Sequence, residues 1–111
     1  MQETVQITRW PADRPPTKED LLRLYAQKGM QPYSWSNAPG DTYGAHVHSY
    51  HKVIYVMRGS ITFGLPEGDA EVTLHPGDRL DLPPGVLHNA VVGPEGVVCL
   101  EGHRREDTGP Q

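Results

Sequence analysis

Residues 40 to 59 read GDTYGAHVHSYHKVIYVMRG, and residues 77 to 88 read GDRLDLPPGVLH. In the first stretch His46 and His48 stand two residues apart, which on a β-strand places both imidazoles on the same face. In the second, a rigid Pro-Pro-Gly turn can return His88 at the start of a new strand. Three imidazole nitrogens suit Zn, Fe, Mn, Ni or Cu, and the order of affinities does not let a sequence choose among these divalent ions.

The chain around these histidines predicts an all-β fold. From Tyr33 onward, short apolar runs are separated by Pro-Gly, Arg-Gly and similar turn sequences. The run at 53–57 is apolar at every position, so both of its faces should be covered, as in a closed barrel or sandwich. This pattern favours a jelly-roll barrel of about eight strands. We expect them near 33–37, 43–48, 52–58, 60–65, 70–74, 79–82, 88–92 and 96–101.

The N-terminal third differs from this pattern. Thr17 offers a helix N-cap, two acidic residues follow it in the first turn, and apolar residues then recur at helical spacing until Gly29. We expect one short helix near residues 17 to 28 within an N-terminal arm of residues 1–29. The tail at 103–111 is too polar to offset its ordering entropy, so we expect it to be flexible.

Composition limits the function classes. The 111 residues suit a single domain over 1–111, and Gly and Pro are frequent, at 12 and 11 residues. The net charge of −4 offers no basic face for nucleic acid. No stretch is apolar enough to span a membrane and the first ten residues lack signal-peptide features, so we expect a cytoplasmic protein with no membrane partner. The lone Cys99 excludes an internal disulfide and a thiolate cluster.

The two quoted stretches together resemble the motifs of the cupin superfamily. Residues 40–59 follow the pattern G-x5-H-x-H-x3-4-E-x6-G except at the glutamate, and residues 77–88 follow G-x5-P-x-G-x2-H throughout. The first motif thus spans 40–59 and the second is expected over 77–92. The resemblance implies a small single-domain cupin, a double-stranded β-helix, with a divalent metal ion on His46, His48 and His88.

The fourth ligand stays open because the chain departs from the family at two positions. Lys52 occupies the position of the glutamate, and Val92 occupies that of an asparagine. His51 stands one place before Lys52 and we expect it to substitute as a ligand. Strand alternation allows only one of the two to point inward, unless the preceding turn shifts the register. A four-histidine site would be closed, whereas three histidines leave positions for water or substrate.

Several other polar residues are more simply read as surface positions. We expect Lys52 to be a solvated edge lysine, Arg79 and Asp81 to form an exposed strand face, and His75 and His103 to lie outside the site. Five aromatic residues could line a ligand pocket in the barrel, but packing in the core or an interface is the simpler expectation. They are Tyr33, Trp35, Tyr43, Tyr50 and Tyr55.

The function expected from these residues is metal-dependent chemistry on a small molecule. The substrate would be a small oxygen- or carboxylate-bearing metabolite, and oxygenase, isomerase and lyase reactions all stay open. A non-catalytic metal- or ligand-binding sensor module is the alternative. We also expect a homodimer, because the resemblance implies one and because Val5 and Ile7 alternate in a segment that could add a strand to a neighbour's sheet.

Overall fold

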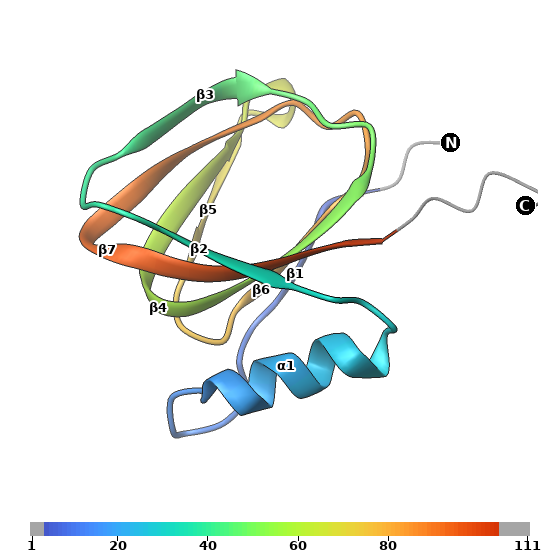
Figure 1. Cartoon of the computed structure of the whole chain (residues 1–111). Coiled ribbons are helices and arrows are strands. Elements are labelled where there is room, and N and C mark those ends of the chain that lie inside the picture. The colour runs from blue at the N-terminus through green and yellow to red at the C-terminus, as the bar shows by residue number, and fades with distance from the viewer. Residues whose placement is uncertain (1–3, 105–111) are drawn as a thin grey trace, which may run out of the picture.

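The computed structural model describes residues 4–104, which form an antiparallel barrel with one helix on its outside (Figure 1). The elements in chain order are β1 (Gln6–Thr8), α1 (Lys18–Gln27), β2 (Tyr33–Asn37), β3 (Thr42–His46), β4 (His51–Leu65), the 3-10 turn η1 (Pro66–Gly68), β5 (Ala70–Leu74), β6 (Arg79–Leu82) and β7 (His88–Arg104). The expected all-β class with one short N-terminal helix is therefore confirmed.

Two long strands organise the barrel. β4 and β7 pair with each other along most of their length, and each replaces two of the shorter strands expected from the sequence. The first half of β4 also pairs with β6, and its second half with β5. The second half of β7 pairs with β2, and its first half with β3. One half of the barrel wall is thus a sheet in the order β1-β6-β4-β7-β2, and in the other half β5 and β3 flank the remaining parts of β4 and β7.

The long strands bend where their register shifts, between Val56 and Arg58 and between Gly59 and Ile61. Gly59 has a φ of +79°, and a Cβ built on it would lie 2.0 Å from the carbonyl oxygen of Gly96 on β7. Any side chain would therefore clash with the backbone of the partner strand, in addition to the strain of its left-handed conformation. The glycine that ends the first sequence motif is what lets the two strands approach at the bend.

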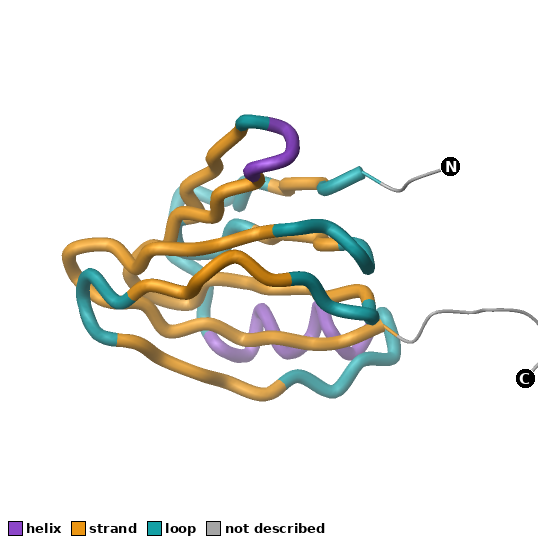
Figure 2. Tube along the Cα trace, turned by 90° about the horizontal axis from the view of Figure 1, so that it is seen from above, coloured by secondary structure: helices purple, strands orange, loops and turns teal. Residues whose placement is uncertain are grey.

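Side chains alternate between two apolar clusters. Side chains on one face of each long strand point into the barrel interior. Among them are Ile54, Ile61 and Phe63, which are at most 4% exposed. The outer cluster packs α1 against the opposite face of β4 and β7, and its members are Leu21, Tyr25, Met30, Val53, Tyr55 and Leu100. In the view from above, α1 lies behind the strands (Figure 2). Strand alternation thus explains why the run at 53–57 is apolar throughout.

The helix is held by its cap and by one buried hydroxyl. The side chain of Thr17 accepts a hydrogen bond from the backbone N–H of Asp20, whose carboxylate accepts one from the N–H of Thr17, which forms a capping box. The Tyr25 hydroxyl lies 2.8 Å from the carbonyl oxygen of Val53 and 2.9 Å from that of Leu100. Tyr25 thereby fastens α1 to both long strands.

The N-terminal strand pairs within its own chain. β1 lies antiparallel to β6, with Ile7 opposite Leu80, so it is not the free strand that we expected to add to a neighbouring sheet. The expected homodimer stays a prediction without that support. Among residues 4–104, no helix is long and apolar enough to cross a membrane.

Candidate metal centre and ligand pocket

Three histidines meet at one end of the barrel. His46 ends β3 and is directly paired with His88, the first residue of β7, while His48 lies just beyond the end of β3. One ring nitrogen from each residue lies within 4.8 Å of those of the other two. The ring centroids are 4.3 Å apart for His46 and His88 and 4.7 Å apart for His46 and His48. Residues far apart in sequence are brought together by the β3–β7 pairing.

Two of the rings are oriented by backbone carbonyl groups. Nδ1 of His46 lies 2.6 Å from the carbonyl oxygen of Gly44, and Nδ1 of His88 lies 2.9 Å from that of Val86. Because a carbonyl can only accept, each Nδ1 donates its proton and leaves the lone pair on Nε2. Hydrogen bonding of this kind on the far nitrogen is the usual support of a metal-bound histidine.

One nitrogen of the group is buried without a partner. Nε2 of His88 has no hydrogen-bond partner among the described residues, although the residue is only 2% exposed. An unpaired polar atom in such a position normally costs free energy. Together with the two neighbouring rings, this orphaned nitrogen fits a divalent metal ion bound to His46, His48 and His88.

The local environment favours the neutral form of His48 and His88, the form that binds a metal. Burial, the charge of Lys52 and the other two histidines together lower the pKa of His48 to about 4. Burial also lowers the pKa of His88, and the carbonyl of Val86 only partly opposes this effect. Neither ring has to lose a proton to bind a metal near neutral pH.

Lys52 points into the barrel, so the expectation of a solvated edge lysine is wrong. Its Nζ lies 3.1 Å from Nε2 of His48 and 3.7 Å from a carboxylate oxygen of Glu101, and its side chain is only 12% exposed. Burial lowers the pKa of Lys52, and Glu101 partly offsets this. Lys52 shares its strand face with Ile54, which lines the interior. Strand alternation therefore directs the ammonium group inward, and the sequence pattern alone did not distinguish the two faces.

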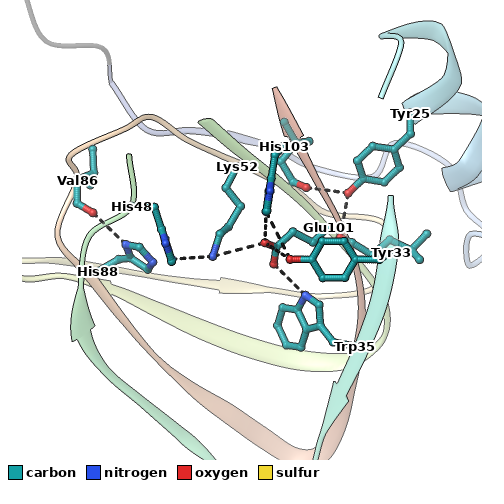
Figure 3. A network of polar contacts seen from close by, with 11 residues as sticks. Tyr25, Tyr33, Trp35, His48, Lys52, Val86, His88, Glu101 and His103 are labelled. Carbon is teal, nitrogen blue, oxygen red and sulfur yellow. Dashed lines mark hydrogen bonds and ion pairs between the residues drawn. The ribbon is translucent and has the colours of Figure 1, made fainter. Parts of the chain in front are cut away.

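Glu101 is the buried acid of the site. Its carboxylate accepts hydrogen bonds from the Tyr33 hydroxyl at 2.7 Å, from Nε1 of Trp35 at 2.9 Å and from Nε2 of His103 at 2.6 Å. Burial alone would raise its pKa, but these bonds and the charge of Lys52 outweigh that effect and the pKa is lowered. Figure 3 shows the resulting row of polar groups from His88 across the barrel to Glu101.

Glu101 was not predicted from the sequence, and His103 was expected to lie outside the site. β7 continues to Arg104, so the start of the expected flexible tail is a strand, and His103 joins the network with its side chain 36% exposed. The part of that tail from residue 105 lies outside the described residues. A signal for Glu101 was present in the sequence: it falls on the same strand face as Val97 and Cys99 in an otherwise apolar run, where an acid must find buried partners.

His51 is not brought together with the other three histidines. It lies on the outer face of β4, where its Nε2 is 3.3 Å from Asp81 and its Nδ1 is 3.2 Å from the guanidinium group of Arg104. Arg79 holds the same Asp81 carboxylate with two hydrogen bonds, at 2.7 and 2.9 Å. Asp81 is buried, so the expected exposed face at Arg79 and Asp81 is also wrong.

The three histidines open onto a pocket of about 350 Å³ inside the barrel. Four of the five aromatic residues considered above line it, whereas Tyr55 packs outside against Tyr25, with ring centroids 5.4 Å apart. The lining residues are Tyr33, Trp35, Tyr43, His46, His48, Tyr50, Lys52, Ile54, Ile61, Phe63, His88, Ala90 and Glu101. The site is therefore a cluster of three histidines that could hold a metal ion, at one side of a mostly apolar cavity.

Comparison with known proteins agrees with this architecture. Residues 34–103 match the family described as Cupin domain, and the chain belongs to the cupin family. No curated protein matches the chain significantly.

Among solved structures, KdgF from a Halomonas species is 29% identical, with a TM-score of 0.55, and the match covers 70% of this chain and 72% of that one. A structural-genomics protein from Rhizobium leguminosarum is 18% identical, with a TM-score of 0.62 over 69% and 71% of the two chains. The DMSP lyase DddQ from Ruegeria pomeroyi is 23% identical, with a TM-score of 0.62 over 74% of this chain and 41% of that one. At these identities the second and third likenesses bear on the fold alone.

Proposed function

We propose that this cupin is a metal-dependent enzyme that acts on a small oxygen- or carboxylate-bearing molecule bound in the barrel pocket. The observation that carries the proposal is the buried Nε2 of His88, which has no hydrogen-bond partner among residues 4–104. It lies beside two further histidines, and one ring nitrogen from each of the three lies within 4.8 Å of those of the others. A divalent ion held there by His46, His48 and His88 would act as a Lewis acid on substrate oxygens.

The placement of His51 favours an open site over a closed one. Since the His51 ring contacts Asp81 and Arg104 on the outer face of β4, we propose three histidine ligands and not four. Three protein ligands leave coordination positions for exchangeable water or substrate, as catalytic metal sites require. A non-catalytic sensor module with a closed metal site, the alternative function, has less support from this geometry.

Lys52 and Glu101 are the charged groups that would serve the reaction. Lys52 Nζ lies 3.1 Å from Nε2 of His48, so the ammonium group would give up this contact if the nitrogen were to hold a metal ion. With that nitrogen engaged, the ammonium group is left with Glu101, 3.7 Å away, and with any anionic group of the substrate. Lys52 would then bind the anionic group of the substrate, and its ammonium group would be the proton donor to the substrate. Glu101, held by three other donors, would fix the position of that ammonium group.

The reaction class stays open among oxygenation, isomerisation and lysis, because a fold does not decide between them. One of the similar structures is described as a lyase, but at 23% identity it indicates the fold only.

Cobalt substitution tests the open site directly. Protein purified without metal is loaded with Co²⁺, and its visible spectrum is recorded before and after addition of glycolate, a small α-hydroxycarboxylate. We expect visible bands that shift when glycolate replaces water on the ion, and no such bands in His88→Ala. Bands that glycolate leaves unchanged would contradict an open site and favour the sensor module.

A further inference from the structure

Several polar groups of the pocket wall already have hydrogen-bond partners within the protein. Trp35 Nε1 and the Tyr33 hydroxyl both donate to Glu101. The Tyr43 hydroxyl donates to the side-chain oxygen of Asn37. Apart from the histidine cluster, Lys52 is the cation that lines this pocket, and its contacts are His48 and Glu101. Among the described residues, the wall therefore offers an anionic ligand one cationic anchor next to the histidine cluster and few further hydrogen bonds, chiefly from the Tyr50 hydroxyl.

The remaining surface of the pocket is apolar. Ile54, Ile61, Phe63 and Ala90 line it and belong to the buried core of the barrel, and Trp35 packs against the same cluster. A ligand with many hydroxyl groups would have to lose its hydration against this surface without replacement hydrogen bonds, which is unfavourable. An apolar group in the same place gains free energy from its own burial.

The size of the pocket sets the size of that apolar group. A dry protein cavity of about 150 Å³ is enough to hold benzene. The pocket here measures about 350 Å³, which leaves room for one ring and a polar head of a few atoms.

We infer that the substrate is a compact amphipathic anion, with a charged oxygen-bearing head toward the metal site and Lys52 and an apolar or aromatic body against Trp35, Ile61 and Phe63. This inference rests on the proposed metal-dependent function and adds the chemical class of the substrate. Polyhydroxylated acids of similar size are excluded as good ligands, because the wall has little to offer their hydroxyl groups.

The test compares acids that share one metal-binding head and differ in the body. Glycolate, mandelate and gluconate are all α-hydroxycarboxylates, with no body, a phenyl ring and a polyol chain respectively. Their binding to the metal-loaded protein is measured by isothermal titration calorimetry, after metal content has been determined on the same sample. We expect mandelate to bind at least about tenfold more tightly than glycolate, from burial of the ring, and gluconate no more tightly than glycolate.

A matched pair of variants locates the body in the pocket. Ala90→Phe fills the apolar part of the cavity, whereas Val91→Phe adds the same bulk at the next position of β7, where the side chain is 44% exposed. Ala90→Phe should lose the advantage of mandelate over glycolate, and Val91→Phe should keep it. The comparison of acids on the unaltered chain needs neither variant, so it decides the question even if Ala90→Phe does not fold.

The two proposals fail in different ways. Protein that holds no metal, or holds metal but does not bind glycolate, contradicts the proposed function and with it this inference. Protein that holds metal and binds glycolate, but binds gluconate as tightly as mandelate or shows no preference for mandelate, overturns the substrate class alone.

Discussion

Replacement of Glu101 by glutamine tests the buried network beside the histidines. The amide keeps the shape of the side chain but removes the charge that three donors and the ammonium group of Lys52 share. Its NH₂ group would face either Trp35 Nε1, which cannot accept a hydrogen bond, or the Tyr33 hydroxyl and the His103 ring, which would have to reorient in order to accept. The Glu101 side chain is 6% exposed, so water does not compensate for these losses.

The cost can be worked from the contacts. A buried donor left without an acceptor costs about 1–3 kcal/mol, and removal of one partner from a buried ion pair costs about 3–5 kcal/mol when the pair is fully enclosed. Because the distance from Lys52 to Glu101 is 3.7 Å and Lys52 is 12% exposed, we take the lower part of these ranges. Glu101→Gln should reduce the free energy of unfolding by about 3 kcal/mol, which lowers the Tm by roughly 13 °C for a domain of this size.

Urea unfolding of the metal-free protein is the assay, with an unchanged m-value as the check that the same transition is observed. The matched control is Glu95→Gln, which neutralises an exposed glutamate on the same strand and should change stability by less than about 0.5 kcal/mol. Adding Lys52→Met to Glu101→Gln should recover part of the loss, because the unpaired ammonium group is removed. A loss below about 0.5 kcal/mol for Glu101→Gln itself would refute the reasoning.

Four further predictions concern other parts of the molecule. Tyr25→Phe should reduce the free energy of unfolding, measured in urea, by about 1–2 kcal/mol, because the carbonyl groups of Val53 and Leu100 lose the hydroxyl that they share. No change would mean that these hydrogen bonds do not stabilise the packing of α1 on the strands. Gly59→Ala should have a much lower melting temperature than Gly40→Ala. Both glycines have a φ of +79°, but a Cβ at position 40 meets no atom within 4 Å. Equal melting temperatures would contradict the close strand approach. The metal-free protein should lose stability as the pH falls from 7 toward about 4.5. The pKa of His48 is about 4 in the folded protein and 6.5 in the unfolded chain, so the unfolded chain takes up the proton first. His48→Gln should flatten the dependence of stability on pH, and an unchanged dependence would contradict the lowered pKa. Light scattering should give about twice the mass of one chain, and a monomer mass would rule out the expected dimer.

Much of the barrel was predictable because its signals are local. The turn sequences and apolar runs placed β2, β5 and β6 at their observed positions, and the capping sequence placed α1 within one residue at each end. The two motifs located the three histidines. The prediction of four shorter strands in place of β4 and β7 was wrong. Glycine-containing segments within these strands have the sequence pattern of turns, but the strands only bend there and stay paired in the sheet.

The choice between His51 and Lys52 was not predictable in the same way. β4 is apolar on both faces, since one face packs in the barrel and the other against α1, so hydrophobic alternation carries no information about which residue points inward. The partners that decide the matter are distant in sequence: Asp81 and Arg104 for His51, and Glu101 for Lys52. A single sequence does not show such pairings.

Metal content of three proteins tests the central claim most directly. The native chain, His88→Ala and His51→Ala are purified without a histidine tag and without added metal, and elemental analysis is combined with a folding check by circular dichroism. We expect about one equivalent of a divalent metal in the native chain and in His51→Ala, and none in His88→Ala. Loss of metal from folded His51→Ala, or its retention by His88→Ala, would contradict the three-histidine centre.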